Sequence, residues 1–257
     1  MSLKQITRGI AGLAIIVLLL PTAAHAGSLV AAASSTRPVL AELQAAYVAE
    51  GGERFDVSYG ASGNLTHQIL RGAPYGIFLS ADNAFVERLA RAGLTRQVDA
   101  YGWGRLVFYA GSKSHCATSA EHSIVLSDAL FENVKHFAIA HPELAPYGRA
   151  AVQALKSAGV WHKLREQLVT GNSVAQAAQY IATGAADCGL IAEPLAFNPQ
   201  LAKQGLVTQV DPSLYPPVKH TMALMKSASS PEVKLYRFFR SEKAMQIFSR
   251  FGFRQEN

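Results

Sequence analysis

The stretches AAASS at residues 31–35 and GASGN at residues 60–64 decide the fold of this chain. Each follows an apolar segment typical of a strand and precedes a segment with helical periodicity. A strand that leads through a turn of small residues into a helix points free backbone N–H groups and serine hydroxyls toward one place. The hydroxyls here are those of Ser34 and Ser62. The two turns therefore predict that the protein holds a small anion with neutral donors.

The rest of the chain repeats the order of strand followed by helix, which predicts α/β architecture with mostly parallel sheets covered on both faces. Strands are expected at residues 28–32, 55–59, 77–79, 106–110, 137–140, 168–169, 188–192, 207–210 and 221–225. Helix starts are expected at Ser34 or Ser35, Asp82 and Ser173, each as a capping residue. Two further strand-to-helix turns are APYG at 145–148 and TGNSV at 170–174. Because ligands of open parallel sheets bind beyond the carboxyl ends of the strands, all four turns could face one cleft.

Residues 1–26 have the pattern of a secretory signal peptide. Lys4 and Arg8 precede an apolar run at 10–20, and AHA at 24–26 matches an A-x-A cleavage site. The apolar run is too short to span a membrane, and no second long run follows. The sequence therefore predicts a periplasmic protein that does not span the membrane and that begins at Gly27 after cleavage.

The charge and the cysteines of the sequence argue against nucleic-acid binding and against metal binding. Without Lys4 and Arg8 the formal net charge falls from +6 to +4, and no Lys/Arg cluster is present, so nucleic acid is not an expected partner. Cys116 and Cys188 could pair in an oxidising compartment, but their separation in space is not given by the sequence, and the question stays open. No His or Cys lies at metal-ligand spacing beside either cysteine, so no metal is expected.

Catalytic motifs are not evident. The chain has neither a phosphate-binding G-x-x-x-x-G-K-[ST] loop nor a G-x-G-x-x-G fingerprint. The second glycine of GASG comes one residue too early for the G-x-S-x-G nucleophile elbow. A secreted serine hydrolase that uses Ser62 with His67 remains the alternative from another class. Simple helix capping by the two serines is the alternative without any function. The sequence favours a binding protein and not an enzyme.

Four segments together resemble the periplasmic molybdate-binding proteins of ABC importers, over essentially the whole mature chain. They are AAAS (31–34), YGASGNL (59–65), GAPYGIFLSAD (72–82) and AMQIFSRFGF (244–253). The resemblance implies the two-lobed periplasmic-binding-protein fold of type II, with the oxyanion between two α/β lobes joined by crossing strands. Residues 27–105 and 213–257 would form the first lobe, and residues 106–212 the second.

The resemblance also implies a ligand set. Ser34 and Ser62 match the serines that offer hydroxyl and backbone donors from the first lobe. Tyr147 and Val174 lie where the family offers backbone N–H groups from the second. Ala192 stands where many members carry a tyrosine whose hydroxyl reaches the anion. The Tyr147 hydroxyl, a water molecule or a different anion could account for that change.

The implied function is capture of molybdate or tungstate, without a cofactor, and delivery to an ABC permease driven by its ATPase. A monomer is expected. Two alternatives keep the same fold: a protein for another small oxyanion or an organic anion, and the ligand-sensing subunit of a signalling receptor.

Overall fold

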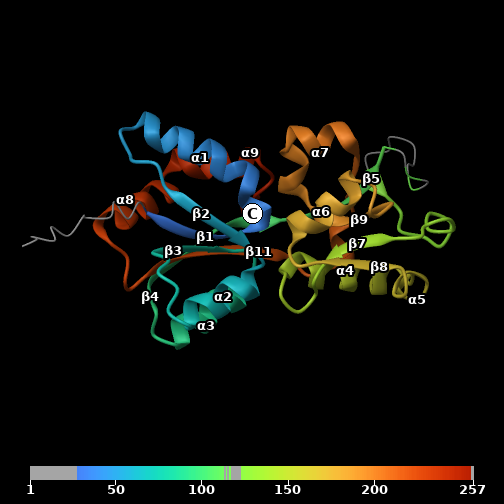
Figure 1. The fold of residues 1–257 in the computed structure, drawn as a ribbon, viewed down its shortest axis with the longest axis horizontal. Coiled ribbons are helices and arrows are strands. Elements are labelled where there is room, and N and C mark those ends of the chain that lie inside the picture. Colours follow the sequence, from blue (N-terminus) through green and yellow to red (C-terminus); the bar gives the residue numbers. More distant parts are fainter. Residues whose placement is uncertain (1–27, 113, 115, 117–122, 256–257) are drawn as a thin grey trace, which may run out of the picture.

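A computed structural model describes residues 28–112, 114, 116 and 123–255. The signal peptide expected at residues 1–26 lies outside this part of the chain. Figure 1 shows two lobes side by side, each with a sheet between layers of helices. The blue, teal and red segments form one lobe, and the green to orange segments form the other. The expected two-lobed α/β fold is confirmed.

In the described residues, the sheet of the first lobe has the strand order β2-β1-β3-β11-β4. Its strands are β1 (Leu29–Ala33), β2 (Asp56–Gly60), β3 (Ile77–Ser80), β4 (Thr95–Gly104) and β11 (Val218–Met225). The strand β1 pairs in parallel with β2 and β3, whereas β11 is antiparallel to β3 and β4. The carboxyl ends of β1 and β2 lie at the same edge, because Ala33 is in register with Gly60.

Side chains of β1 alternate between two cores, as a strand with both faces covered requires. Val30 packs in the core under α1 (Arg37–Ala49), α8 (Ser230–Phe239) and α9 (Glu242–Arg250). Ala31 packs in the core under α2 (Ser62–Leu70) and α3 (Asn83–Arg91). Figure 1 shows these two groups of helices on opposite faces of the sheet.

The sheet of the second lobe has the order β6-β10-β5-β9-β7-β8 in the described residues. Its strands are β5 (Leu106–Gly111), β6 (Ser123–Ile124), β7 (Phe137–Ala140), β8 (Leu168–Gly171), β9 (Cys188–Ala192) and β10 (Gly205–Val210). Its α-helices are α4 (Pro146–Ser157), α5 (Trp161–Leu164), α6 (Val174–Ala182) and α7 (Pro199–Gln204). The strand β7, buried along its whole length, is parallel to β8 and β9.

The chain passes from the first sheet to the second between Gly104 and Leu106, and it returns between Val210 and Val218. Between these last two residues lies the short 3₁₀ helix η3 (Pro212–Leu214). The sequence did not predict β4, which ends at the first crossing. The first crossing is thus nearly direct, with Arg105 between β4 and β5, whereas the return passes through η3.

Cys116 and Cys188, whose pairing the sequence left open, form a disulfide with a Cα–Cα distance of 6.1 Å. The bond ties β9 to the segment after β5, so it lies within the second lobe. In the described part of the chain, none of the helices combines the length and the apolar character needed to cross a membrane.

Candidate functional site: a pocket between the lobes

The four strand-to-helix turns meet at one small pocket between the lobes, which we call the anion pocket. Its lining residues are Ala33, Ser34, Ser35, Gly60, Ala61, Ser62, Ala81, Ala145, Pro146, Tyr147 and Val174. The first lobe contributes the turn after β1 and the start of α2, and the second contributes the starts of α4 and α6. Four of the five residues that the sequence singled out therefore lie together.

Three helices begin at the anion pocket: α2 at Ser62, α4 at Pro146 and α6 at Val174. The first turn of a helix leaves backbone N–H groups without intrahelical partners, and the helix dipole adds a partial positive charge there. No charged residue is among the described residues that line the pocket. The arrangement offers an anion neutral N–H donors from three directions.

The hydroxyl oxygens of Ser34 and Ser62 each accept a hydrogen bond from a backbone N–H at the anion pocket. The Ser62 Oγ accepts a hydrogen bond from the Ala81 N–H at 3.0 Å, and the Ser34 Oγ accepts one from the Ala175 N–H at 3.2 Å. Both serines are buried. Because each oxygen already accepts from the backbone, its own proton is available for donation to a ligand. Both serines are thereby set up as donors.

Comparison with known proteins agrees with this geometry. The family model for bacterial extracellular solute-binding proteins matches residues 29–254. The chain belongs to this family. A molybdate-binding protein ModA from Rhodobacter capsulatus is 31% identical, with 97% of each chain covered. A second ModA, from Azotobacter vinelandii, is 30% identical and covers 91% of this chain and 93% of the relative.

Solved structures give the same result for the fold of this solute-binding protein. The periplasmic molybdate-binding protein of Azotobacter vinelandii matches with a TM-score of 0.78 at 27% identity, covering 89% of this chain and 99% of that one. The sulfate-binding protein SubI from Mycobacterium tuberculosis matches with a TM-score of 0.71 at 16% identity, covering 91% and 88%. At that identity the second match speaks for the fold alone.

The expected helix cap at Ser34 or Ser35 is wrong. Residues Ser34–Thr36 form the 3₁₀ turn η1, and α1 starts after Thr36, whose side chain makes no capping bond. The turn frees the Ser34 hydroxyl to meet α6 of the opposite lobe. The capping predictions at Asp82 and Ser173 are confirmed, since their side chains accept from the N–H groups of Ala84 and Gln176.

Ser35 is a pocket residue that the sequence reasoning treated only as a possible cap. It is fully buried and lines the anion pocket, and its Oγ has no hydrogen-bond partner in the described structure. A buried hydroxyl without a partner costs about 1–3 kcal/mol, which a ligand could recover. The second serine of AAASS is the sequence feature from which Ser35 could have been predicted as a pocket residue.

One alternative from the sequence is that the Tyr147 hydroxyl reaches the anion, but the structure bonds this hydroxyl to a histidine. It lies 3.0 Å from Nε2 of His220, a buried residue of β11. Burial raises the pKa of Tyr147 well above its usual value, so the hydroxyl is neutral. Tyr147 lines the anion pocket, and in this structure its hydroxyl is bonded to His220.

Ala192 is the predicted site residue that the structure leaves apart. It is the last residue of β9, fully buried, and opposite Leu106 in the sheet. It does not belong to the lining of the anion pocket. A methyl side chain here brings no donor.

The hydrolase alternative needs a base bonded to Ser62, and within the described residues the hydrogen-bond partner of its hydroxyl is a backbone N–H. His67 is exposed and contacts Nη1 of Arg88 at 3.2 Å, whereas the Ser62 Oγ is bonded to the Ala81 N–H. A nucleophilic serine needs a base within hydrogen-bond reach. Among the described residues there is also no cluster of three or more His, Cys, Asp or Glu that could hold a metal.

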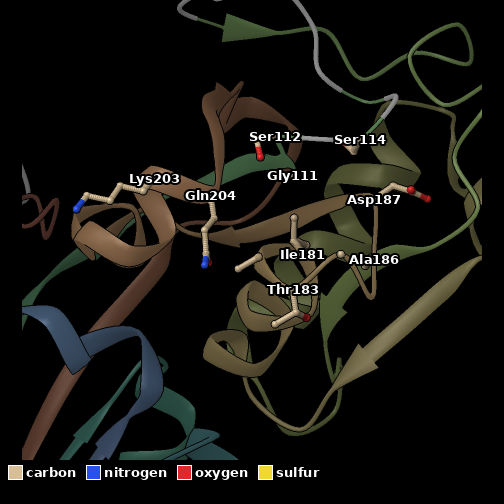
Figure 2. A pocket seen from close by; sticks show the side chains of 11 residues that line it. Gly111, Ser112, Ser114, Ile181, Thr183, Ala186, Asp187, Lys203 and Gln204 are labelled. Atoms are coloured by element: carbon tan, nitrogen blue, oxygen red, sulfur yellow. The ribbon is translucent and has the colours of Figure 1, made fainter.

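A larger cavity of about 530 Å³ lies within the second lobe (Figure 2). Its lining includes the C-terminal end of α6 near Thr183 and Gly184, together with Asp187 and Lys203. Asp187 Oδ2 accepts from the backbone N–H groups of Lys135 and His136. A helix C-terminus carries partial negative charge, so this solute-binding protein has a poorer place for an anion there.

Proposed function

We propose that this protein captures molybdate, and tungstate as an anion of nearly the same size, in the anion pocket. It then delivers the anion in the periplasm to a membrane permease driven by an ATPase. The observation that carries the proposal is the convergence of four strand-to-helix turns, two from each lobe, on a pocket lined by uncharged donors. The likeness to two ModA proteins over more than nine-tenths of the chain supports the choice of ligand.

The donor set suits a tetrahedral dianion. Hydrogen bonds to a charged acceptor are about twice as strong as those between neutral groups, so several neutral donors can hold two negative charges. We assign donation to the hydroxyls of Ser34, Ser35 and Ser62 and to the backbone N–H groups of Tyr147 and Val174. Ser35 takes the place of the donor that Ala192 lacks. This assignment explains why a buried hydroxyl without a partner faces the anion pocket.

Selectivity follows from the size of the pocket and the direction of its hydrogen bonds. Sulfate and phosphate are smaller than molybdate, so they would leave donors unpaired at about 1–3 kcal/mol each. A protonated phosphate meets a further difficulty, because Ser34 Oγ and Ser62 Oγ already accept from the backbone. Among the described lining residues no carboxylate can accept the phosphate proton, and the Ser35 Oγ is the serine oxygen left without a backbone donor.

Closure of the lobes around the anion would complete the site. The contacts that already span the lobes include Ser34 Oγ with the Ala175 N–H, the Gly63 N–H with the Leu144 carbonyl at 2.9 Å, and the ion pair of Arg149 with Asp82. An anion bonded to both lobes adds to these contacts, so binding favours the closed arrangement. A docking permease can recognise that arrangement.

Calorimetric titration of the mature protein with molybdate, tungstate, sulfate and phosphate at one pH tests the proposal. We expect submicromolar affinity for the first two and no measurable heat for the others. Strong binding of sulfate or phosphate alone would assign the protein to another oxyanion. The variants Ser34→Ala and Ser62→Ala test the site, with Ser157→Ala, an exposed residue at the end of α4, as the matched control. Wild-type affinity in both pocket variants would contradict the assigned site.

A further inference from the structure

A chain of buried polar side chains joins the lobes beside the anion pocket. His220 of β11 is fully buried, with Nε2 3.0 Å from the Tyr147 hydroxyl and Nδ1 2.9 Å from the Tyr101 hydroxyl. Tyr101 belongs to β4 of the first lobe and Tyr147 to α4 of the second. Both tyrosines are also buried. In the donor set proposed above, none of these three side chains donates to the anion.

The hydrogen-bond directions in this chain can be worked out. The Tyr101 hydroxyl has one proton, and assigning it to the Ser80 carbonyl at 3.2 Å makes the hydroxyl the acceptor for Nδ1–H of His220. Nε2 is then the acceptor, and the Tyr147 hydroxyl donates to it. Burial lowers the pKa of His220 to about 3, so the imidazole is neutral near neutral pH and this single tautomer fits.

Both ends of the chain reach residues of the anion pocket. At one end, Tyr147 is the second residue of α4 and lines the pocket. At the other end, Ser80 precedes Ala81, whose N–H bonds the Ser62 Oγ, and both Ala81 and Ser62 line the pocket. The polar chain therefore links the donors of one lobe to those of the other without touching the ligand.

The hydrogen-bonded side chains of Tyr101, His220 and Tyr147 also lie where the polypeptide crosses between the lobes. A Cβ atom placed on Gly104, the last residue of β4, would collide with the Tyr147 hydroxyl and lie 2.9 Å from Nε2 of His220. Only a residue without a side chain lets the crossing strand pass this close. The crossing strand and the two partners across the lobes are thus packed as one unit.

We propose that His220 is a positioning residue that holds the two lobes in the closed arrangement, so that the donors of α4 and of Ser62 face one anion. The proposal rests on the proposed function for its ligand. The Tyr147–His220 bond is made in the closed arrangement and given up on opening. Its loss therefore shifts the protein toward open forms and weakens binding.

The variant Tyr147→Phe tests this inference, because it removes the hydroxyl and keeps the ring and the backbone N–H. Tyr109→Phe is the matched control, since the buried Tyr109 hydroxyl donates to the Leu201 carbonyl at 2.8 Å within the second lobe, outside the anion pocket. Each variant loses one buried hydrogen bond. A merely structural role would therefore lower the urea midpoint of both variants and leave the affinity per folded molecule unchanged.

Two measurements read out the proposal. By calorimetry with molybdate, we expect Tyr147→Phe to bind about 5- to 100-fold more weakly than wild type and Tyr109→Phe to bind like wild type. By small-angle scattering without ligand, we expect a larger radius of gyration for Tyr147→Phe and no change for the control. Tyr101→Phe should shift both readouts in the same direction, and it serves as the test should Tyr147→Phe not fold.

The outcomes separate this inference from the proposed function. If wild type binds molybdate and Tyr147→Phe binds equally well, the positioning role is overturned and the proposed function stands. If wild type does not bind molybdate, the proposed function fails, and the ligand-free scattering still decides the positioning role. A wild-type radius of gyration in Tyr147→Phe overturns it in either case.

Discussion

Replacement of Ser62 by alanine should remove two interactions of one hydroxyl, which are its hydrogen bond with the Ala81 N–H and its proposed donation to the anion. The Ser62 Oγ accepts from the buried Ala81 N–H at 3.0 Å, so the variant leaves that donor without a partner. A buried unsatisfied group costs about 1–3 kcal/mol of unfolding free energy. The variant also removes the proton that we propose Ser62 donates to the anion. We expect this loss to weaken molybdate binding by about 1–3 kcal/mol, or roughly 5- to 150-fold in Kd.

Ser34→Ala is the variant whose losses of affinity and stability are compared with those of Ser62→Ala. The Ser34 Oγ accepts from Ala175 of the opposite lobe, so its loss affects the contact between lobes and not the packing within the first lobe. We expect a similar loss of affinity for Ser34→Ala and a smaller loss of unfolding free energy than for Ser62→Ala.

Calorimetric titration and urea unfolding of both variants measure these quantities. A Ser62→Ala protein with an affinity within twofold of wild type would refute the reasoning that its hydroxyl is a donor to the ligand. Equal stability losses in the two variants would refute the distinction between contacts within and between lobes.

Three further predictions concern the surroundings of the anion pocket. Gly104→Ala places a methyl group against the Tyr147 hydroxyl, so we expect molybdate affinity to fall by at least tenfold, measured by titration; unchanged affinity would contradict the close packing. Because the pKa of His220 is lowered to about 3 in the folded protein, its contribution to stability is present above pH 6.5 and is lost as the pH falls from 6.5 toward 3, at up to about 1.4 kcal/mol per unit. The urea midpoint should therefore fall on acidification in this window, and it should fall less in His220→Gln. Equal slopes of the midpoint against pH in wild type and variant would contradict the lowered pKa of His220. Replacing Cys116 and Cys188 by serine opens a loop of 72 residues and should lower the unfolding free energy by about 2–4 kcal/mol, with molybdate affinity kept within twofold.

Local signals in the sequence predicted most of the scaffold. Asp82 and Ser173 were recognised as caps because their side-chain oxygens act on N–H groups two or three residues away. The strand β4 was missed because it lies at the edge of its sheet, where polar residues such as Arg96 and Asp99 interrupt the apolar pattern.

The site was predictable only in part, because its contacts join distant parts of the chain. Ser34 and Ser62 could be chosen from their turns, but the hydrogen bond of Ser34 with Ala175 of α6 joins residues 141 positions apart. The bond between Tyr147 and His220 joins residues 73 positions apart in different lobes. No periodicity or capping rule points to such a pair, and a lone histidine in an apolar strand resembles any buried core residue.

The uncharged lining of the anion pocket has a consequence for the conditions in which the protein works. Dissolved salt screens the attraction between separated charges over about 10 Å at 0.1 M, but it acts little on hydrogen bonds made at contact distance inside a buried pocket. A site built on lysine or arginine would lose its ligand steadily as the salt concentration rises. A site made of serine hydroxyls and backbone N–H groups, as we propose for this pocket, should keep its affinity for the anion over the same range of salt concentration.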